Sequence, residues 1–273
     1  MQQNIPLNSI TYYLAVFSST VLYYTYAYVR DSTANTHNER AVWYLDNRQM
    51  VKLSQIVLTL VLCTSVFSII KALPPHFFSV PLYYYPLLVS FPLVAALYYG
   101  VNSPALRKYN LRDTGWLKSF IIGFVWAGAV SVYPVIFASL SHGITYELSL
   151  FKVLLFIKNC MFITVLCIMF DIKDYAADHN KQLKTFVVRV GLRKTIFYIL
   201  IPLCSIGLGT FLIYAFVHQF SWWRISCNTL PFTLLIMVAY SMYQRKSILY
   251  YLAVIDGLMF VKALCGIMSV IKW

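Results

Sequence analysis

Acidic residues are scarce in this sequence, with only nine Asp and Glu among 273 residues. Charged residues of both signs make up 11% of the chain, whereas hydrophobic residues make up 60%. This balance lies well outside the range of soluble globular domains and indicates a polytopic membrane protein. The longest polar stretches, about 30–52, 99–118 and 171–193, hold only about 20 residues each, which is too short for a separate soluble domain. We expect them to be connections with short helices.

Several signatures of soluble enzymes are also missing. The sequence has no Walker-type glycine-rich loop, no Gly-x-Ser-x-Gly element and no internal repeat. It lacks a basic amino-terminal region, so we expect no cleavable signal peptide. The six cysteines fall in apolar segments without the spacing of a metal site, and we interpret them as small buried hydrophobes.

Apolar segments of roughly 20 residues, the length that crosses a bilayer as a helix, recur along the chain. We expect an all-α bundle of about eight transmembrane helices, forming a single domain over residues 1–273. Pro81, Pro86 and Pro92 predict that the third helix is kinked or begins late. The predicted segments are 9–29, 53–71, 80–98, 117–140, 148–170, 194–217, 225–243 and 247–270.

Lys and Arg are distributed unevenly between the connections. Sixteen of the 22 lie in or beside the first, third, fifth and seventh connections, and the other connections hold chiefly Lys71, Lys152 and Arg224. By the positive-inside rule the odd-numbered connections face the cytoplasm and both termini lie outside. The net charge of +13 is therefore explained by membrane topology, and we expect no nucleic-acid partner.

Three of the few carboxylates, Asp171, Asp174 and Asp178, are gathered at the end of the fifth segment. Their spacing places them within about 60° of one helix face. Because like charges there repel and also oppose the helix dipole, a bound Mg²⁺ would explain the cluster better than folding does. The alternative is a solvated acidic turn neutralised by neighbouring lysines.

The run Asp171-Ile172-Lys173-Asp174-Tyr175-Ala176-Ala177-Asp178 resembles the second Asp-rich motif of the UbiA superfamily of membrane prenyltransferases. Shorter stretches agree with that family in order and spacing. These are Leu111-Arg112, Trp116-Leu117-Lys118, Trp126-Ala127, Lys184-Thr185-Phe186, Val188-Arg189-Val190-Gly191 and Asp256-Gly257. Glu39-Arg40 with Trp43 resembles the branch of small bacterial homologues.

Two departures accompany this resemblance. The family fold has nine helices, and here the first has no counterpart, either because it is lost or because the sequence is truncated. The first Asp-rich motif is degraded, since Thr25 and Ala27 stand where related sequences carry acids. Asp31, one helical turn beyond Ala27, is either a substitute metal ligand or an ordinary helix-end acid beside Arg30.

The resemblance implies Mg²⁺-dependent transfer of an isoprenyl group from an isoprenyl diphosphate to an acceptor, aromatic compounds being one option. The reaction would take place at the cytoplasmic mouth of a bundle in the bacterial cytoplasmic membrane. The implied metal ligands are Asp171, Asp174, Asp178 and Asp31; the diphosphate partners are Arg112, Lys118, Lys181 and Lys184; and the isoprenoid cavity residues are Tyr24, Tyr28 and Asp256.

Other interpretations remain open. The basic residues also fit the role of topological anchors, and the tyrosines that of an interfacial belt. The chain is alternatively an inactive homologue that binds a lipid diphosphate or a partner protein, or, as a third option, a small transporter. Lys158, Asp256 and Lys262 lie within apolar segments, and we expect each to point into the bundle. Gly123 and Ala127 are too weak a small-residue motif to indicate a dimer.

Overall fold

The structure is a computed structural model of the chain, and all its regular elements among the described residues are helices. The all-α class predicted from the sequence is therefore confirmed. The described residues are 5–30, 39–72, 81–99, 115–143, 147, 149–173, 175, 185–244 and 246–270.

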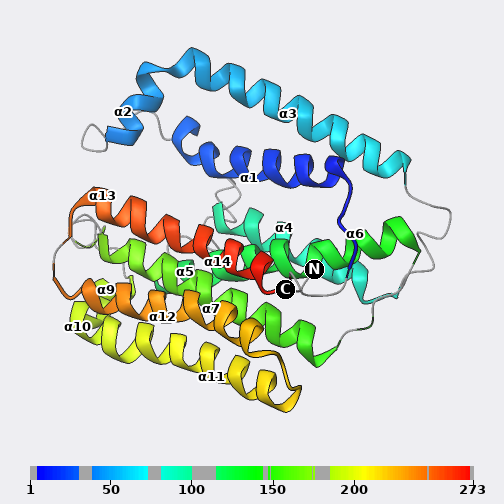
Figure 1. Cartoon of the computed structure of the whole chain (residues 1–273). Coiled ribbons are helices and arrows are strands. Elements are labelled where there is room, and N and C mark those ends of the chain that lie inside the picture. The colour runs from blue at the N-terminus through cyan, green and yellow to red at the C-terminus, as the bar shows by residue number, and fades with distance from the viewer. Residues whose placement is uncertain are drawn as a thin grey trace. The chain divides into compact units, whose positions relative to one another are not determined.

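Each predicted apolar segment falls on one long helical run (Figure 1). Five helices account for five of the segments: α1 (Ile10–Arg30), α3 (Arg48–Lys71), α4 (Tyr84–Tyr99), α7 (Leu150–Lys173) and α12 (Trp222–Ser241). Two short helices, α2 (Glu39–Asp46) and α9 (Phe186–Val190), lie in the polar connections, as the sequence predicted.

The three remaining runs each contain a π-helical turn. Such turns insert an extra residue and shift which side chains face a neighbouring helix. The runs are α5 (Gly115–Ala127) with Gly128–Val132 and α6 (Tyr133–His142); α10 (Leu192–Lys194) with Thr195–Leu200 and α11 (Ile201–Val217); and α13 (Ile248–Tyr250) with Tyr251–Ile255 and α14 (Asp256–Met268).

The late start of α4 follows from its prolines. The helix begins at Tyr84, after Pro81, and Pro86 lies in its first turn, where a missing backbone N–H leaves no helical bond unmade. The predicted late start is therefore confirmed. Pro92 lies inside the helix, which spans only 16 residues.

Four helical runs among the described residues are long and apolar enough to cross a membrane: Arg48–Lys71, Gly115–His142, Leu150–Lys173 and Leu192–Val217. Helices suit this environment because they satisfy every backbone polar group internally. The fold is therefore that of a helical membrane protein. Half of the most apolar stretch of α7 is buried, against 39% of that of Gly115–His142 and 22% of that of Leu192–Val217, so α7 is the central helix of its bundle.

The helices divide into two compact units. One comprises residues 6–81 and 137–145, and in it α1 pairs with α3. Gln55 on α3 donates a hydrogen bond from Nε2 to Thr25 Oγ1 on α1, at 2.6 Å. The ring of Tyr12 packs against that of Phe137, with centroids 4.8 Å apart.

The other unit comprises residues 1–5, 82–136 and 146–273, and its core forms around α7. Phe162 of α7 is fully buried and meets Phe232 of α12 edge to face, with ring centroids 5.4 Å apart. Successive helices alternate in direction, so this unit has two distinct ends. We call them the Asp171 end, where α7 finishes, and the pocket end, where α7 begins and α11 and α14 finish.

Candidate functional site

Close packing of α5 on α7 builds the Asp171 end. Ser119, Gly123 and Ala127 recur every four residues on α5 and are all buried. A Cβ on Gly123 would overlap Thr164 Oγ1 and lie 2.9 Å from the Cys160 carbonyl oxygen. The small-residue spacing noted in the sequence therefore serves a helix contact within the chain.

This contact brings Asp171 against the start of α5. Its side chain is only 2% exposed, and each oxygen has a partner. Lys118 Nζ donates to Oδ1 at 3.1 Å, and Ser119 Oγ donates to Oδ2 at 3.0 Å. A buried carboxylate is costly unless it is paired and hydrogen-bonded, and these two consecutive residues supply both requirements.

The segment after the Asp-rich run returns to the same end of the unit. Thr185 caps α9 by accepting a hydrogen bond from the Val188 N–H at 3.5 Å, and Val187 is fully buried in the core. The ring of Phe186 meets Trp116 and Phe120 of α5, with centroid distances of 6.3 and 5.9 Å. α9 is thereby fixed beside the Lys118–Asp171 pair.

The structure brings together two residues that the sequence assigned to different roles, Asp171 to the metal and Lys118 to the diphosphate. Reasoning from the sequence missed Ser119, whose only signal was its place beside Lys118. Tyr24 lies on α1 in the other unit with an exposed side chain. Six predicted residues and the side chain of Tyr28 fall outside the described part of the chain; the six are Asp31, Arg112, Asp174, Asp178, Lys181 and Lys184.

Asp171 suits Mg²⁺ as an oxygen ligand. An ionised carboxylate only accepts, through about four positions on its two oxygens, and oxygen ligands are those that Mg²⁺ prefers. The described residues contain no group of three His, Cys, Asp or Glu side chains placed to hold a metal ion. Two of the three carboxylates expected to form such a group, Asp174 and Asp178, are not among them.

The expectation that the charged groups of the apolar segments face the interior holds for Lys158, which is 7% exposed. Lys262 is partly buried, with Nζ 4.1 Å from the ring centroid of the core residue Phe162. Asp256 differs from the expectation, because its side chain is exposed. The buried positions beside it, Ile255 and Leu258, define a helix face about 100° or more away from Asp256.

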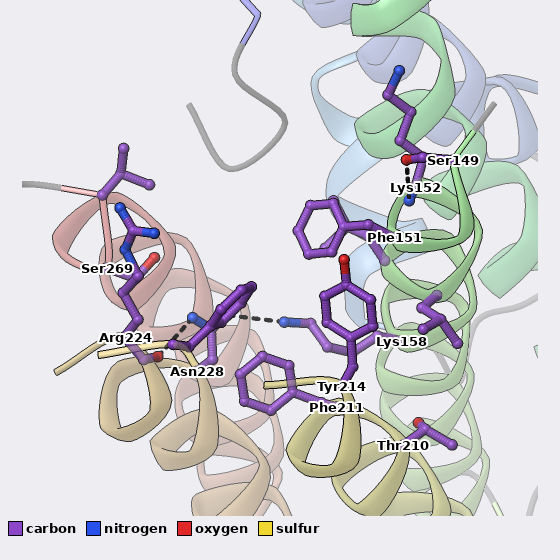
Figure 2. A pocket seen from close by; sticks show the side chains of 14 residues that line it. Ser149, Phe151, Lys152, Lys158, Thr210, Phe211, Tyr214, Arg224, Asn228 and Ser269 are labelled. Carbon is purple, nitrogen blue, oxygen red and sulfur yellow. Dashed lines mark hydrogen bonds between the residues drawn. The ribbon is translucent and has the colours of Figure 1, made fainter. Parts of the chain in front are cut away.

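A pocket of about 380 Å³ opens at the pocket end (Figure 2). Its walls come from the first turns of α7, the last turns of α11, the start of α12 and the residues after α14. Lys158 reaches across it from α7 and donates a hydrogen bond to Asn228 Oδ1 of α12 at 2.9 Å. Along α7, Lys158 and Asp171 are about 20 Å apart, so the pocket and the carboxylate are separate sites.

The fold and these sites define a helical membrane protein with a buried, ion-paired carboxylate at one end of a bundle and a basic pocket at the other. Comparison of the chain with protein-family models, with curated proteins and with solved structures found no match in any of the three.

Proposed function

We propose that the chain is a membrane prenyltransferase of the UbiA type, which transfers an isoprenyl group from an isoprenyl diphosphate to an acceptor. The observation that carries the proposal is the Lys118–Asp171 pair at 3.1 Å. The two residues are 53 positions apart, and each belongs to a different one of the sequence motifs that predict the reaction centre. Their pairing supports a single centre at the Asp171 end.

In this proposal the protein has about eight membrane spans. The Asp171 end faces the cytoplasm of a bacterial cell, where the positive-inside rule places most of the Lys and Arg residues. An isoprenyl chain would extend from this end into the apolar interior of the bundle, while its charged diphosphate stays near the membrane surface.

Lys118 supplies positive charge for the diphosphate. Its side chain is 35% exposed whereas that of Asp171 is 2% exposed, so Lys118 is the member of the pair that a ligand reaches. A bound diphosphate would share Lys118 with Asp171 through charge-assisted hydrogen bonds. Asp171 keeps the ammonium group in place before the ligand arrives, which reduces the ordering needed on binding.

Asp174 and Asp178, with Asp171, are the residues that would hold Mg²⁺. When bound, the ion would neutralise charge that develops on the diphosphate as it leaves. The reaction breaks the bond between the allylic carbon and the diphosphate oxygen. The acceptor forms a new bond to that carbon and loses a proton, and inorganic diphosphate is released.

The test is binding of a non-hydrolysable isoprenyl thiolodiphosphate to the detergent-purified protein, with and without Mg²⁺. We would compare the wild type with an Asp174→Asn, Asp178→Asn double variant. Asp171 is left unchanged, because its burial makes any substitution there a folding test as well. Asp46→Asn, an exposed acid at the end of α2, is the matched control.

Mg²⁺-dependent binding that the double variant loses and the control keeps is the expected result. Equal binding by all three proteins, or binding that ignores Mg²⁺, would rule out the proposed metal site. Turnover would then be sought by incubating the wild type with labelled isoprenyl diphosphate and a panel of acceptors.

One observation favours the second candidate, an inactive homologue that binds a lipid diphosphate without turnover. Thr25 occupies a position where related sequences carry an acid, and its hydroxyl is engaged in neutral hydrogen bonds. It accepts from Gln55 and donates to the Val21 carbonyl at 2.7 Å. A neutral pair at this position contributes no charge to a second metal ion, which favours binding without transfer.

A further inference from the structure

The pocket at the far end of the unit from Asp171 is strongly basic. Lys152, Lys158 and Arg224 line it, and none of its described lining residues is acidic. Glu147 lies two residues before Ser149, the first residue that lines the pocket, and its carboxylate is near enough to interact with Lys152. Lys152 Nζ also donates a hydrogen bond to the Glu147 backbone carbonyl oxygen at 2.6 Å. Among the described residues, three cations therefore lie near one carboxylate.

Lys158 is the group whose environment calls for an anion. It is 7% exposed, and its partners are neutral: the Asn228 amide oxygen at 2.9 Å and the ring of Phe211, whose centroid is 4.6 Å away. Among the described residues it makes no ion pair with a carboxylate. Lys262 is near enough for its charge to repel that of Lys158. A buried ammonium group without a counterion is costly.

The amide of Asn228 is held in one orientation. Its Nδ2 donates to the Arg224 carbonyl oxygen at 2.9 Å, which leaves Oδ1 directed at Lys158. Figure 2 shows Lys158 extending from α7 toward Asn228, with the rings of Phe211 and Tyr214 beside it. This bond uses one of the three ammonium N–H groups and fixes the position of the others.

The location of these cations is unusual for this chain. Sixteen of the 22 Lys and Arg residues lie in or beside the odd-numbered connections of the sequence, and Lys152, Lys158 and Arg224 are three of the remaining six. Topology alone does not explain why half of that minority lines one pocket. Anion binding explains it, because several cations in a pocket with apolar walls of low dielectric constant attract negative charge more strongly.

Aromatic side chains line another part of the pocket. The ring of Phe151 of α7 packs on that of Tyr214 of α11, with centroids 5.3 Å apart. Phe220, in the turn after α11, also lines the pocket, and its ring centroid is 5.9 Å from that of Tyr214. A volume of about 380 Å³ exceeds that of a bare phosphate and lies in the range of small-molecule sites. The lining therefore suits a ligand with both an anionic and an apolar part.

We propose that this pocket binds an organic phosphate, with the phosphate between Lys158 and Arg224 and the apolar part against the aromatic rings. A phosphate suits this arrangement because the guanidinium of Arg224 can donate two parallel hydrogen bonds to it and Lys158 adds a point charge. The phosphate belongs either to a membrane phospholipid or to a soluble ester.

The test is native mass spectrometry of the full-length protein in detergent. Dioleoylphosphatidic acid is the probe, and dioleoylglycerol, which has the same chains without the phosphate, is its matched comparison. The protein variants are Lys158→Met and Arg224→Gln. Because Arg224 is exposed, its replacement keeps the test valid if Lys158→Met fails to fold. Lys71→Met, an exposed lysine ending α3 in the other unit, is the control.

We expect phosphatidic acid to bind more tightly than dioleoylglycerol, and each pocket variant to weaken it by roughly tenfold or more, with Lys71→Met unchanged. Displacement by millimolar glycerol 3-phosphate would assign a soluble ester, and resistance to it would assign a lipid headgroup. The proposal is overturned if the pocket variants bind as the wild type does, or if both lipids bind equally.

Discussion

Gly123 on α5 and Thr164 on α7 are in such close contact that a methyl group on the glycine would occupy the position of the threonine hydroxyl. The approach of these two helices places Ser119 and Lys118, one turn earlier on α5, against Asp171, two turns later on α7. The carboxylate site therefore depends on a packing contact that contains no charged group.

Replacing Gly123 by Ala should therefore destabilise the protein. The added methyl group meets backbone at the Cys160 carbonyl as well as the Thr164 side chain, so the helices must separate, at a cost of about 1–3 kcal/mol. The free energy of unfolding in mixed micelles measures this. Gly209→Ala on α11, where a Cβ meets nothing within 4 Å, is the control and should be neutral or slightly stabilising.

The Lys118–Asp171 pair should show strong coupling in a double-mutant cycle. Lys118→Met leaves a buried carboxylate without this counterion and should lower the free energy of unfolding by about 1–3 kcal/mol. The loss should be smaller than for a fully buried pair, because Lys118 is partly exposed to solvent. Asp171→Asn removes the charge but keeps an acceptor for Ser119. Combined, the two changes should cost less than their sum. Strict additivity in unfolding experiments would show that the pair contributes nothing.

The positions of the long helices were predictable because each coincides with an apolar segment long enough to be read directly. The predicted segment 194–217 and the observed run Leu192–Val217 differ by two residues, for example. Polar connections gave no such signal, and there only the presence of short helices was anticipated. The division into two units was not anticipated, because hydropathy reports burial from water and not which helices contact one another.

The candidate site was predictable only in part. Asp171 and Lys118 stood out because charge is rare in this chain, but Ser119 did not, since a single serine beside an apolar run has many ordinary roles. The exposure of Asp256 was missed because the expectation came from the cost of a charge facing lipid, and hydropathy does not show which face of a helix packs against its neighbours. The pocket was missed because its lining comes from four separated segments.

Gly191 should resist substitution for a reason unrelated to space. A Cβ there would meet nothing within 4 Å, yet its φ of +89° belongs to a region that favours glycine. Gly191→Ala should cost about 1–2 kcal/mol and weaken the anchoring of α9. Thermal unfolding in detergent measures it. Gly257→Ala, also in open space but helical, should match or exceed the wild type, and an equal loss in both variants would contradict a conformational cause.

Restoring an acid at position 25 should distinguish the two candidate functions. In Thr25→Asp the new carboxylate can still accept the hydrogen bond from Gln55, so α1 and α3 should stay paired. If the chain is a prenyltransferase with a weakened first motif, the variant should raise Mg²⁺-dependent product formation from labelled isoprenyl diphosphate. Gln49→Asp, at an exposed position in the first turn of α3, controls for added charge alone. Absence of product from wild type and variant alike would favour the inactive homologue.

The two ends of the α7 bundle should lie on opposite sides of the membrane. In a background where the exposed Cys63 is replaced by Ser, cysteines that replace Ser149, just before α7, and Gln244, after α12, place one exposed thiol at each end. Because Lys and Arg are concentrated in the odd-numbered connections of the sequence, which include the connection after α12 but not the one before α7, we expect a membrane-impermeant maleimide to label Ser149→Cys in intact cells. Gln244→Cys should react only after the cells are opened. Labelling in the reverse order would invert the proposed topology and place the basic pocket in the cytoplasm, where soluble phosphate esters would be its expected ligands.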